Sequence, residues 1–258
     1  MRIIQDKVEA LGQFAADLIA ERIADRPDAV IGLATGSSPI PIYAELARRV
    51  ADGTLDLSSV RFFALDEYVG LAPDHPMSYR YFLDEHVTRP CRLDPAQLRV
   101  LNGKAPDLFA ECLDYETAIR AAGGIDLQLL GIGHNGHIAF NEPTSSFASR
   151  TRVVALTHQT VEANARFFGD HEDVPLLALS QGMGTILEAG RVVLIALGAG
   201  KAAAIRSAIE GELTSSIPAS ALQMHQRATF LVDEFAGSML ARDDFYRRER
   251  NIIPNYGH

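Results

Sequence analysis

Residues 29–39 read Ala29-Val30-Ile31-Gly32-Leu33-Ala34-Thr35-Gly36-Ser37-Ser38-Pro39, an apolar run followed by a loop of small and hydroxyl-bearing residues. Apolar residues then recur at helical spacing at Ile42, Leu46 and Val50. This order predicts a buried strand, a tight loop and a helix. Such a loop offers backbone N–H groups and hydroxyls at the positive end of a helix, which suits a phosphate. Ser and Thr are equally typical of plain helix caps, so the loop alone leaves both interpretations open.

Four more apolar runs stand in the same relation to a polar loop. Residues 60–65 precede Asp66 and Glu67, and residues 125–132 precede the loop 133–143. Residues 191–197 precede Gly198 and Lys201, and residues 229–232 precede Asp233 and Glu234. Helical patterns lie at 107–121, 159–168, 181–189 and 201–210. Apolar positions from Ile4 to Ile19 also recur at helical spacing and predict an opening helix that ends before Pro27.

Strands that are apolar on both faces and alternate with helices are typical of a parallel sheet covered on each side. We therefore expect an α/β fold with three layers, a Rossmann-like, mostly parallel sheet with helices on both faces. The 258 residues are 47% hydrophobic and contain no evident repeat or low-complexity linker, so we expect one domain over residues 1–258. Ligands of such sheets bind beyond the carboxyl ends of the strands, where the polar loops fall.

Composition narrows the class of partner. The formal net charge of −9 argues against nucleic acid, because that surface needs clustered Lys and Arg. The two cysteines, Cys91 and Cys112, are too few for a disulfide framework and lack the spacing of a zinc site. No apolar run reaches the roughly 20 residues of a membrane span, and charged residues interrupt the first 22 positions. We expect a cytoplasmic protein with no membrane partner.

The stretch Gly131-Ile132-Gly133-His134-Asn135-Gly136 matches the Gly-x-Gly-x-x-Gly pattern of dinucleotide-binding loops. That interpretation needs a helix directly after the glycines and an acidic residue about 20 positions further on. Pro143 interrupts the segment, and residues 152–156 contain no acid. We expect instead that these glycines let the backbone turn closely around another kind of ligand.

Acid and base side chains gather at two of the predicted strand ends. His137 and Glu142 share the loop after residues 125–132, and Asp66 and Glu67 follow residues 60–65. A histidine titrates near neutrality and can move a proton to and from an oxygen, while a carboxylate orients it. A partly desolvated aspartate can take a carbon-bound proton. Each residue alone is typical of a protein surface, but the combination favours proton-transfer chemistry.

Several longer segments carry a more specific signal. They are Gly32-Leu33-Ala34-Thr35-Gly36-Ser37-Ser38-Pro39, Leu65-Asp66-Glu67-Tyr68-Val69-Gly70-Leu71, Gly136-His137-Ile138-Ala139-Phe140-Asn141-Glu142-Pro143, Ser149-Arg150-Thr151-Arg152, residues 156–168, and Leu222-Gln223-Met224-His225. Together they resemble the glucosamine-6-phosphate deaminase family, in the family's order and over nearly the whole chain. The second and third segments distinguish the chain from the related 6-phosphogluconolactonases.

The resemblance implies an isomerizing deaminase that converts glucosamine 6-phosphate and water to fructose 6-phosphate and ammonia in amino-sugar catabolism. It makes Asp66 the base that moves a proton between C2 and C1. It assigns ring opening to His137 assisted by Glu142, with Asn135 in the same cluster. The residues that it implies for substrate and phosphate binding are Thr35, Gly36, Ser37, Ser38, Arg166 and Lys201. It implies neither a metal nor an organic cofactor.

The chain departs from the family pattern at two positions. Asn135 stands where many relatives carry Asp, so we expect a changed pH profile with activity retained. Val154 stands where allosterically activated hexameric relatives carry a Lys that binds the phosphate of N-acetylglucosamine 6-phosphate, although Ser145 and Arg152 remain. We expect weak or absent activation by that effector.

Three other functions stay open at this point. A galactosamine-6-phosphate deaminase would use the same mechanism on the C4 epimer. A non-catalytic sugar-phosphate sensor would keep the fold but would not need Asp66, His137 and Glu142. A lactonase would need only water attack on an ester. The family includes monomers and hexamers, so the sequence predicts a monomer or a homo-oligomer.

Overall fold

The computed structural model describes residues 1–166, 168 and 174–252, and a seven-stranded sheet runs through it. The strand order is β1-β10-β9-β6-β2-β3-β5, and every pairing within this sheet is parallel. The strands are β1 (Arg2–Gln5), β2 (Val30–Leu33), β3 (Arg61–Ala64), β5 (Leu98–Arg99), β6 (Leu127–Leu130), β9 (Val192–Ala196) and β10 (Ala228–Val232). In β2, β6, β9 and β10 every residue is buried, which explains why they appear in the sequence as apolar runs that only Gln128 and Thr229 interrupt.

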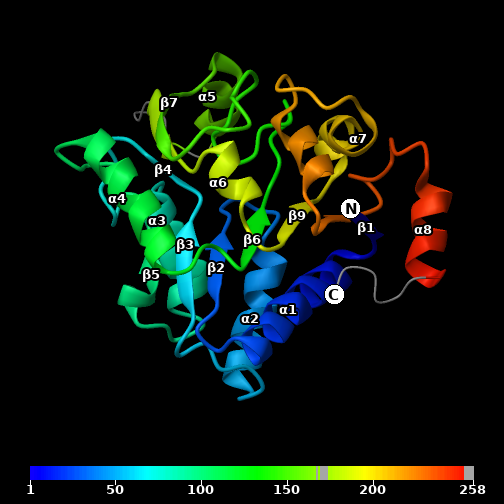
Figure 1. Ribbon diagram of the computed structural model, residues 1–258, viewed down its shortest axis with the longest axis horizontal. Helices are drawn as coiled ribbons and strands as arrows, with labels where there is room; N and C mark the ends of the chain where they lie inside the picture. Colours follow the sequence, from blue (N-terminus) through cyan, green and yellow to red (C-terminus); the bar gives the residue numbers. More distant parts are fainter. Residues whose placement is uncertain (167, 169–173, 253–258) are drawn as a thin grey trace.

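Helices flank this sheet, which confirms the three-layer α/β prediction (Figure 1). They are α1 (Val8–Asp25), α2 (Ile40–Ala51), α3 (Tyr79–Leu83), α4 (Leu108–Ala121), α5 (His158–Ala165), α6 (Met183–Leu187), α7 (Ala202–Glu210) and α8 (Asp243–Ile252). Figure 1 shows α1 and α2 packed side by side and α8 at the sheet edge formed by β1. None of the described helices combines the length and the apolar character that crossing a bilayer requires.

The start of the predicted opening helix is wrong. Ile4 belongs to β1, which pairs in parallel with β10, and the helix begins only at Val8. Ile3 and Ile4 are both buried, and their backbone pairs with the edge of β10 that β9 does not cover. The four-residue spacing from Ile4 to Val8 therefore fits a helix without forming one, since tertiary pairing overrides the local pattern.

A second sheet has no counterpart among the predicted strands. It is antiparallel, in the order β4-β8-β7, and contains β4 (Asp66–Tyr68), β7 (Arg152–Ala155) and β8 (Leu177–Ser180). Its strands are three or four residues long, too short to produce a periodic signal. Because β4 begins directly after β3, this sheet fixes the direction in which Asp66 leaves the main sheet.

Candidate active site

A cavity of about 200 Å³ opens beyond the carboxyl ends of β2, β3 and β6. It lies where ligands of doubly wound sheets bind. The proposed site residues that line it are Thr35, Gly36, Ser37, Ser38, Asp66, Asn135, His137, Arg166 and Lys201. Glu142 stands behind this wall, next to His137. The fold thus collects the proposed residues from five separate segments, although their chemical roles remain predictions.

One end of the cavity has the character of an anion site. The loop from Thr35 to Ser38 connects β2 to α2, and Gly36 adopts a φ of +93°, which favours glycine. Lys201 reaches the same cavity from the start of α7, and within the described residues no carboxylate pairs with its ammonium group. Burial, reinforced by the nearby Arg166, lowers the pKa of Lys201. A bound phosphate would relieve this repulsion between two cations.

Asp233 fixes the turn that carries Lys201. Both of its carboxylate oxygens accept a hydrogen bond from the backbone N–H of Gly198, at 3.0 and 2.9 Å. Gly198 has a φ of +85°, so this turn needs a glycine as well as the carboxylate. Asp233, which directly follows β10, therefore holds the backbone turn from which Lys201 enters the site.

Asp66 is the buried carboxylate of the cavity, with 6% of its surface exposed. Burial, with a further contribution from the charge of Glu67, raises the pKa of Asp66 well above its ordinary value. No hydrogen bond reaches its carboxylate from any residue that the structure describes. A carboxylate with so little stabilisation of its charge is a stronger base than a solvated aspartate, which suits removal of a carbon-bound proton.

Glu67 does not join Asp66 in the cavity, contrary to the grouping suggested by the sequence. Its carboxylate accepts hydrogen bonds from the backbone N–H groups of Tyr68, Tyr79 and Arg80, at 2.8 to 3.0 Å. Two of these donors belong to the first turn of α3, so Glu67 caps that helix. Successive side chains of a strand point to opposite sides, and on β4 this separates the two neighbouring acids.

His137 and Glu142 form the second chemical centre. Nδ1 of His137 lies 3.5 Å from Oε2 of Glu142, and Nδ2 of Asn135 donates a 2.7 Å hydrogen bond to the same oxygen. The hydroxyls of Thr157 and Thr160 donate to the other oxygen, Oε1. Burial opposes the ionisation of Glu142, but the contacts from His137 and Thr160 outweigh it and lower its pKa to about 2. Glu142 is therefore a charged group that can orient His137 and stabilise its imidazolium form.

The loop that carries this pair is tightly folded. A Cβ at Gly133 would stand 2.4 Å from the His137 ring, so only glycine fits there. Ala139, which also lines the cavity, has a φ of 50°, a strained conformation for a residue with a side chain. Residues 131–151, all of which are described, form turns and no helix. The helix that a dinucleotide-binding loop requires directly after its glycines is therefore absent from this segment, and Gly133 allows the close approach of His137.

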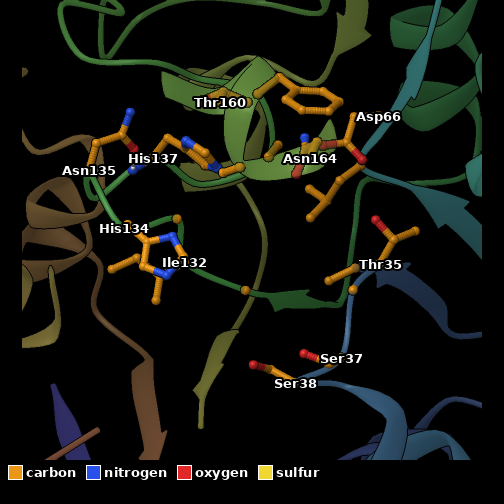
Figure 2. Close-up of a pocket in the computed structure, with 18 of the residues that line it drawn as sticks. Thr35, Ser37, Ser38, Asp66, Ile132, His134, Asn135, His137, Thr160 and Asn164 are labelled. Atoms are coloured by element: carbon orange, nitrogen blue, oxygen red, sulfur yellow. Dashed lines mark hydrogen bonds between the residues drawn. The ribbon is translucent and has the colours of Figure 1, made fainter. Parts of the chain in front are cut away.

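Figure 2 shows cavity residues that the sequence analysis did not identify, among them His134, Thr160 and Asn164. Thr160 and Asn164 come from α5, which also contributes Gln159 and leads to Arg166. Tyr79 is a further lining residue, from the start of α3. No local motif marks these side chains, because only the packing of α3 and α5 over the loops brings them to the site. His134 lies inside the stretch from Gly131 to Gly136, which matches the Gly-x-Gly-x-x-Gly pattern.

The chain matches a known protein family over most of its length. The family model described as glucosamine-6-phosphate isomerases/6-phosphogluconolactonase matches residues 4–231. A glucosamine-6-phosphate deaminase of Arthrobacter sp. (strain FB24) is 54% identical over 95% of this chain and 94% of its own length. The corresponding protein of Cellvibrio japonicus is 48% identical over 99% of both chains.

Solved structures agree with this relationship. A monomeric glucosamine-6-phosphate deaminase matches with a TM-score of 0.90 and 42% identity, over 93% of this chain and all of its own. The 6-phosphogluconolactonase of Trypanosoma brucei has a TM-score of 0.71 and 19% identity, over 93% of this chain and 98% of its own. The lactonase therefore shares the fold, whereas the deaminase shares the fold and much of the sequence.

Proposed function

This chain belongs to the family of glucosamine-6-phosphate isomerases and 6-phosphogluconolactonases, and we propose that its cavity converts glucosamine 6-phosphate and water to fructose 6-phosphate and ammonia. It is an enzyme of amino-sugar metabolism, a glucosamine-6-phosphate deaminase, as are relatives about half identical to it over nearly their full length. The observation that carries the proposed mechanism is the gathering of Asp66, the His137–Glu142 pair and Lys201 around one cavity.

In the proposed first step His137 opens the sugar ring. The imidazole takes the proton of the C1 hydroxyl and returns a proton to the ring oxygen, so the C1–O5 bond breaks and the open-chain aldehyde forms. Glu142 stands 3.5 Å behind Nδ1 and stabilises the transient imidazolium. Its hydrogen bonds with Asn135 and Thr160 keep the carboxylate ionised and in place during this transfer.

In the second step Asp66 carries out the isomerisation. The carboxylate removes the proton from C2, and the electron pair forms a C1–C2 double bond. The C1–O1 double bond opens at the same time, and O1 takes up a proton from solvent, which gives an enolamine. Asp66 then returns the proton to C1, so C2 becomes an imine. Water adds to the imine carbon, ammonia leaves, and the ketose phosphate remains. The raised pKa of Asp66 suits both halves of this transfer, because it brings the group closer to the pH at which it must accept and return a proton.

Contacts with the phosphate group position the substrate in the cavity. We assign it to the loop of Gly36, Ser37 and Ser38, with Arg166 and Lys201 as cations. These groups are remote from C1 and C2, so their binding energy can align the reacting carbons with Asp66. We assign no metal or organic cofactor to the reaction.

The wider setting of the enzyme is also a proposal. We propose one domain over residues 1–258, because the structural relative and this chain match over nearly their whole lengths. We propose a monomer, since that relative is described as monomeric and Val154 lacks the activator-binding cation of the hexameric enzymes. A cytoplasmic location, where sugar phosphates are found, follows from the proposed substrate. Light scattering of the purified protein tests the assembly.

The direct test is to incubate the chelator-treated protein separately with glucosamine 6-phosphate and galactosamine 6-phosphate, and to measure ammonia and ketose phosphate. We expect equal amounts of ammonia and fructose 6-phosphate from the glucosamine ester, and none with Asp66→Asn. Turnover of the galactosamine ester alone would keep the mechanism and replace the substrate. Absence of turnover with both esters would contradict the proposal and favour a lactonase or a sensor.

A further inference from the structure

His134 projects into the cavity from the same loop as His137, and nothing in the proposed reaction uses it. Figure 2 shows its ring between Asn135 and His137 on one side and Ser37 and Ser38 on the other. Its Nε2 edge faces the turn that carries Lys201, because a Cβ at Gly200 would lie 3.2 Å from Nε2. The ring is therefore directed toward the end of the cavity that we assign to the phosphate.

The ring of His134 is also chemically available. It is exposed, and no residue of the described part of the chain forms a hydrogen bond with it. A histidine that served only to stabilise the loop would be expected to donate or accept a hydrogen bond within it. Its near neighbours in the loop do so: the amide of Asn135 contacts Glu142, and the His137 backbone contacts Asn135.

Among the residues that the structure describes, the charged groups that act on His134 are positive or can become positive. Lys201 faces it from the start of α7, Arg166 from the end of α5, and His137 from its own loop. Repulsion from Lys201, followed by the partial burial of the ring and the charges of Arg166 and His137, lowers the pKa of His134. The free protein therefore holds His134 as a neutral imidazole near neutral pH.

We propose that His134 is a further substrate-binding residue, which contacts the phosphate of the bound sugar and takes up a proton from solvent when the dianion binds. The phosphate neutralises the surrounding cations, so protonation of the ring is then favoured instead of opposed. The inference rests on the proposed function, because it requires a sugar phosphate in this cavity. It adds a pH-dependent contact to the permanent charges of Arg166 and Lys201.

The consequence is a substrate affinity that falls as pH rises. Below the pKa of the bound His134 the ring donates a charge-assisted hydrogen bond, and above it that bond is lost. The second ionisation of a phosphate ester, at about pH 6, also affects binding. That ionisation belongs to the substrate and is the same for every protein variant, so a comparison of variants isolates the contribution of His134.

The test is isothermal titration calorimetry with fructose 6-phosphate, the product of the proposed reaction. Ammonia is left out, so fructose 6-phosphate binds but cannot be converted back to glucosamine 6-phosphate. Titrations in two buffers of different ionisation enthalpy give the number of protons taken up per ligand. Wild type is compared with His134→Gln, which can form a hydrogen bond but cannot become charged. The matched control is His158→Gln, the same change on an imidazole that is exposed and outside the cavity.

We expect wild type and His158→Gln to take up more protons than His134→Gln at neutral pH. We also expect the KM of His134→Gln for glucosamine 6-phosphate to be higher by about tenfold, the size of one charge-assisted hydrogen bond. This difference should shrink as the pH rises and wild-type His134 loses its charge in the complex. A second variant, His134→Lys, carries a permanent charge and should bind well without proton uptake.

Equal proton uptake by wild type and His134→Gln, with equal affinity, would overturn the inference while leaving the deaminase intact. Equal loss of affinity in His134→Gln and His134→Lys would also overturn it, because the effect would then come from shape and not from charge. Failure of wild type to bind fructose 6-phosphate or to release ammonia would instead contradict the proposed function itself.

Discussion

Nδ2 of Asn135 donates a 2.7 Å hydrogen bond to Oε2 of Glu142, the same carboxylate oxygen that lies 3.5 Å from Nδ1 of His137. Asn135 is a neutral amide, so it fixes Glu142 without adding charge. Asn135 also receives a hydrogen bond from the backbone N–H of His137, at 3.2 Å. It therefore ties together the two residues that we assign to ring opening.

Replacing Asn135 by Asp should move the pH–rate profile. A second carboxylate beside His137 favours the imidazolium, so the limb of the kcat/KM profile that His137 controls should shift to higher pH by about one unit. Asn135→Ala, which removes the hydrogen bond without adding charge, is the control and should lower the rate without that shift. A profile of Asn135→Asp that coincides with wild type would show that this position does not control the protonation of His137.

Replacing Asp66 by Asn should abolish turnover and stabilise the protein. Burial raises the pKa of Asp66 in the folded state, so above the unfolded pKa of about 3.9 the unfolded chain releases this proton more readily and folding is disfavoured. The amide removes that penalty. We expect the Tm of Asp66→Asn at pH 7 to exceed that of wild type by about 2–4 °C for each kcal/mol gained in the free energy of unfolding. Below about pH 4 the two proteins should have the same Tm. A Tm at pH 7 equal to or below that of wild type would contradict the assignment of a buried base whose charged form is poorly stabilised.

Replacing Thr160 by Val should impair catalysis through Glu142. The hydroxyl of Thr160 donates to Oε1 of Glu142, and its loss leaves the carboxylate less stabilised, so the pKa of Glu142 should rise above about 2. We expect kcat to fall about tenfold, in line with the free energy of a lost hydrogen bond to a charged group. As the pH is lowered, Glu142 should become protonated at a higher pH than in wild type, so the acid limb of the rate profile should move to higher pH. Thr160→Ser keeps the donor and should restore both. Failure of the serine variant to do so would indicate a role in packing instead.

The sequence predicts the main sheet well, because β2 and β9 are buried on both faces and consist of uninterrupted apolar residues, and β6 departs from this pattern only at Gln128. It does not predict β4, whose three residues decide that Asp66 faces the cavity while Glu67 caps α3. No pattern distinguishes two adjacent acids when the strand is that short. In the same way Thr160 and Asn164 belong to α5, a short helix in which Thr160 is the buried residue, and only the position of α5 beside the 131–143 loop gives them access to the site.

Replacing Lys201 by Met should weaken recognition of the phosphate while sparing the fold. The ammonium is partly buried without a carboxylate partner among the described residues, and burial lowers its pKa. In the free protein at pH 7 the charge of Lys201 therefore lowers the free energy of unfolding, and we expect the Tm of the variant to equal or exceed that of wild type. We expect kcat/KM to fall about a hundredfold, the loss of one desolvated phosphate contact. Inhibition by inorganic phosphate should weaken in parallel, and unchanged inhibition would place the phosphate elsewhere.

N-acetylglucosamine 6-phosphate should leave the kinetics of this enzyme unchanged. In the activated relatives that the sequence resembles, a Lys at the position of Val154 binds the effector phosphate, but here Val154 lies on β7 and packs against the apolar cluster that contains Tyr68 and Phe140. The guanidinium of Arg152 is already held by Asn141, at 2.8 Å, and by Ser145, at 3.0 Å. A phosphate would have to displace these contacts without a second cation to stabilise it. We expect hyperbolic saturation by glucosamine 6-phosphate that is identical with and without the effector, and a leftward shift of the curve on its addition would contradict this account of Val154.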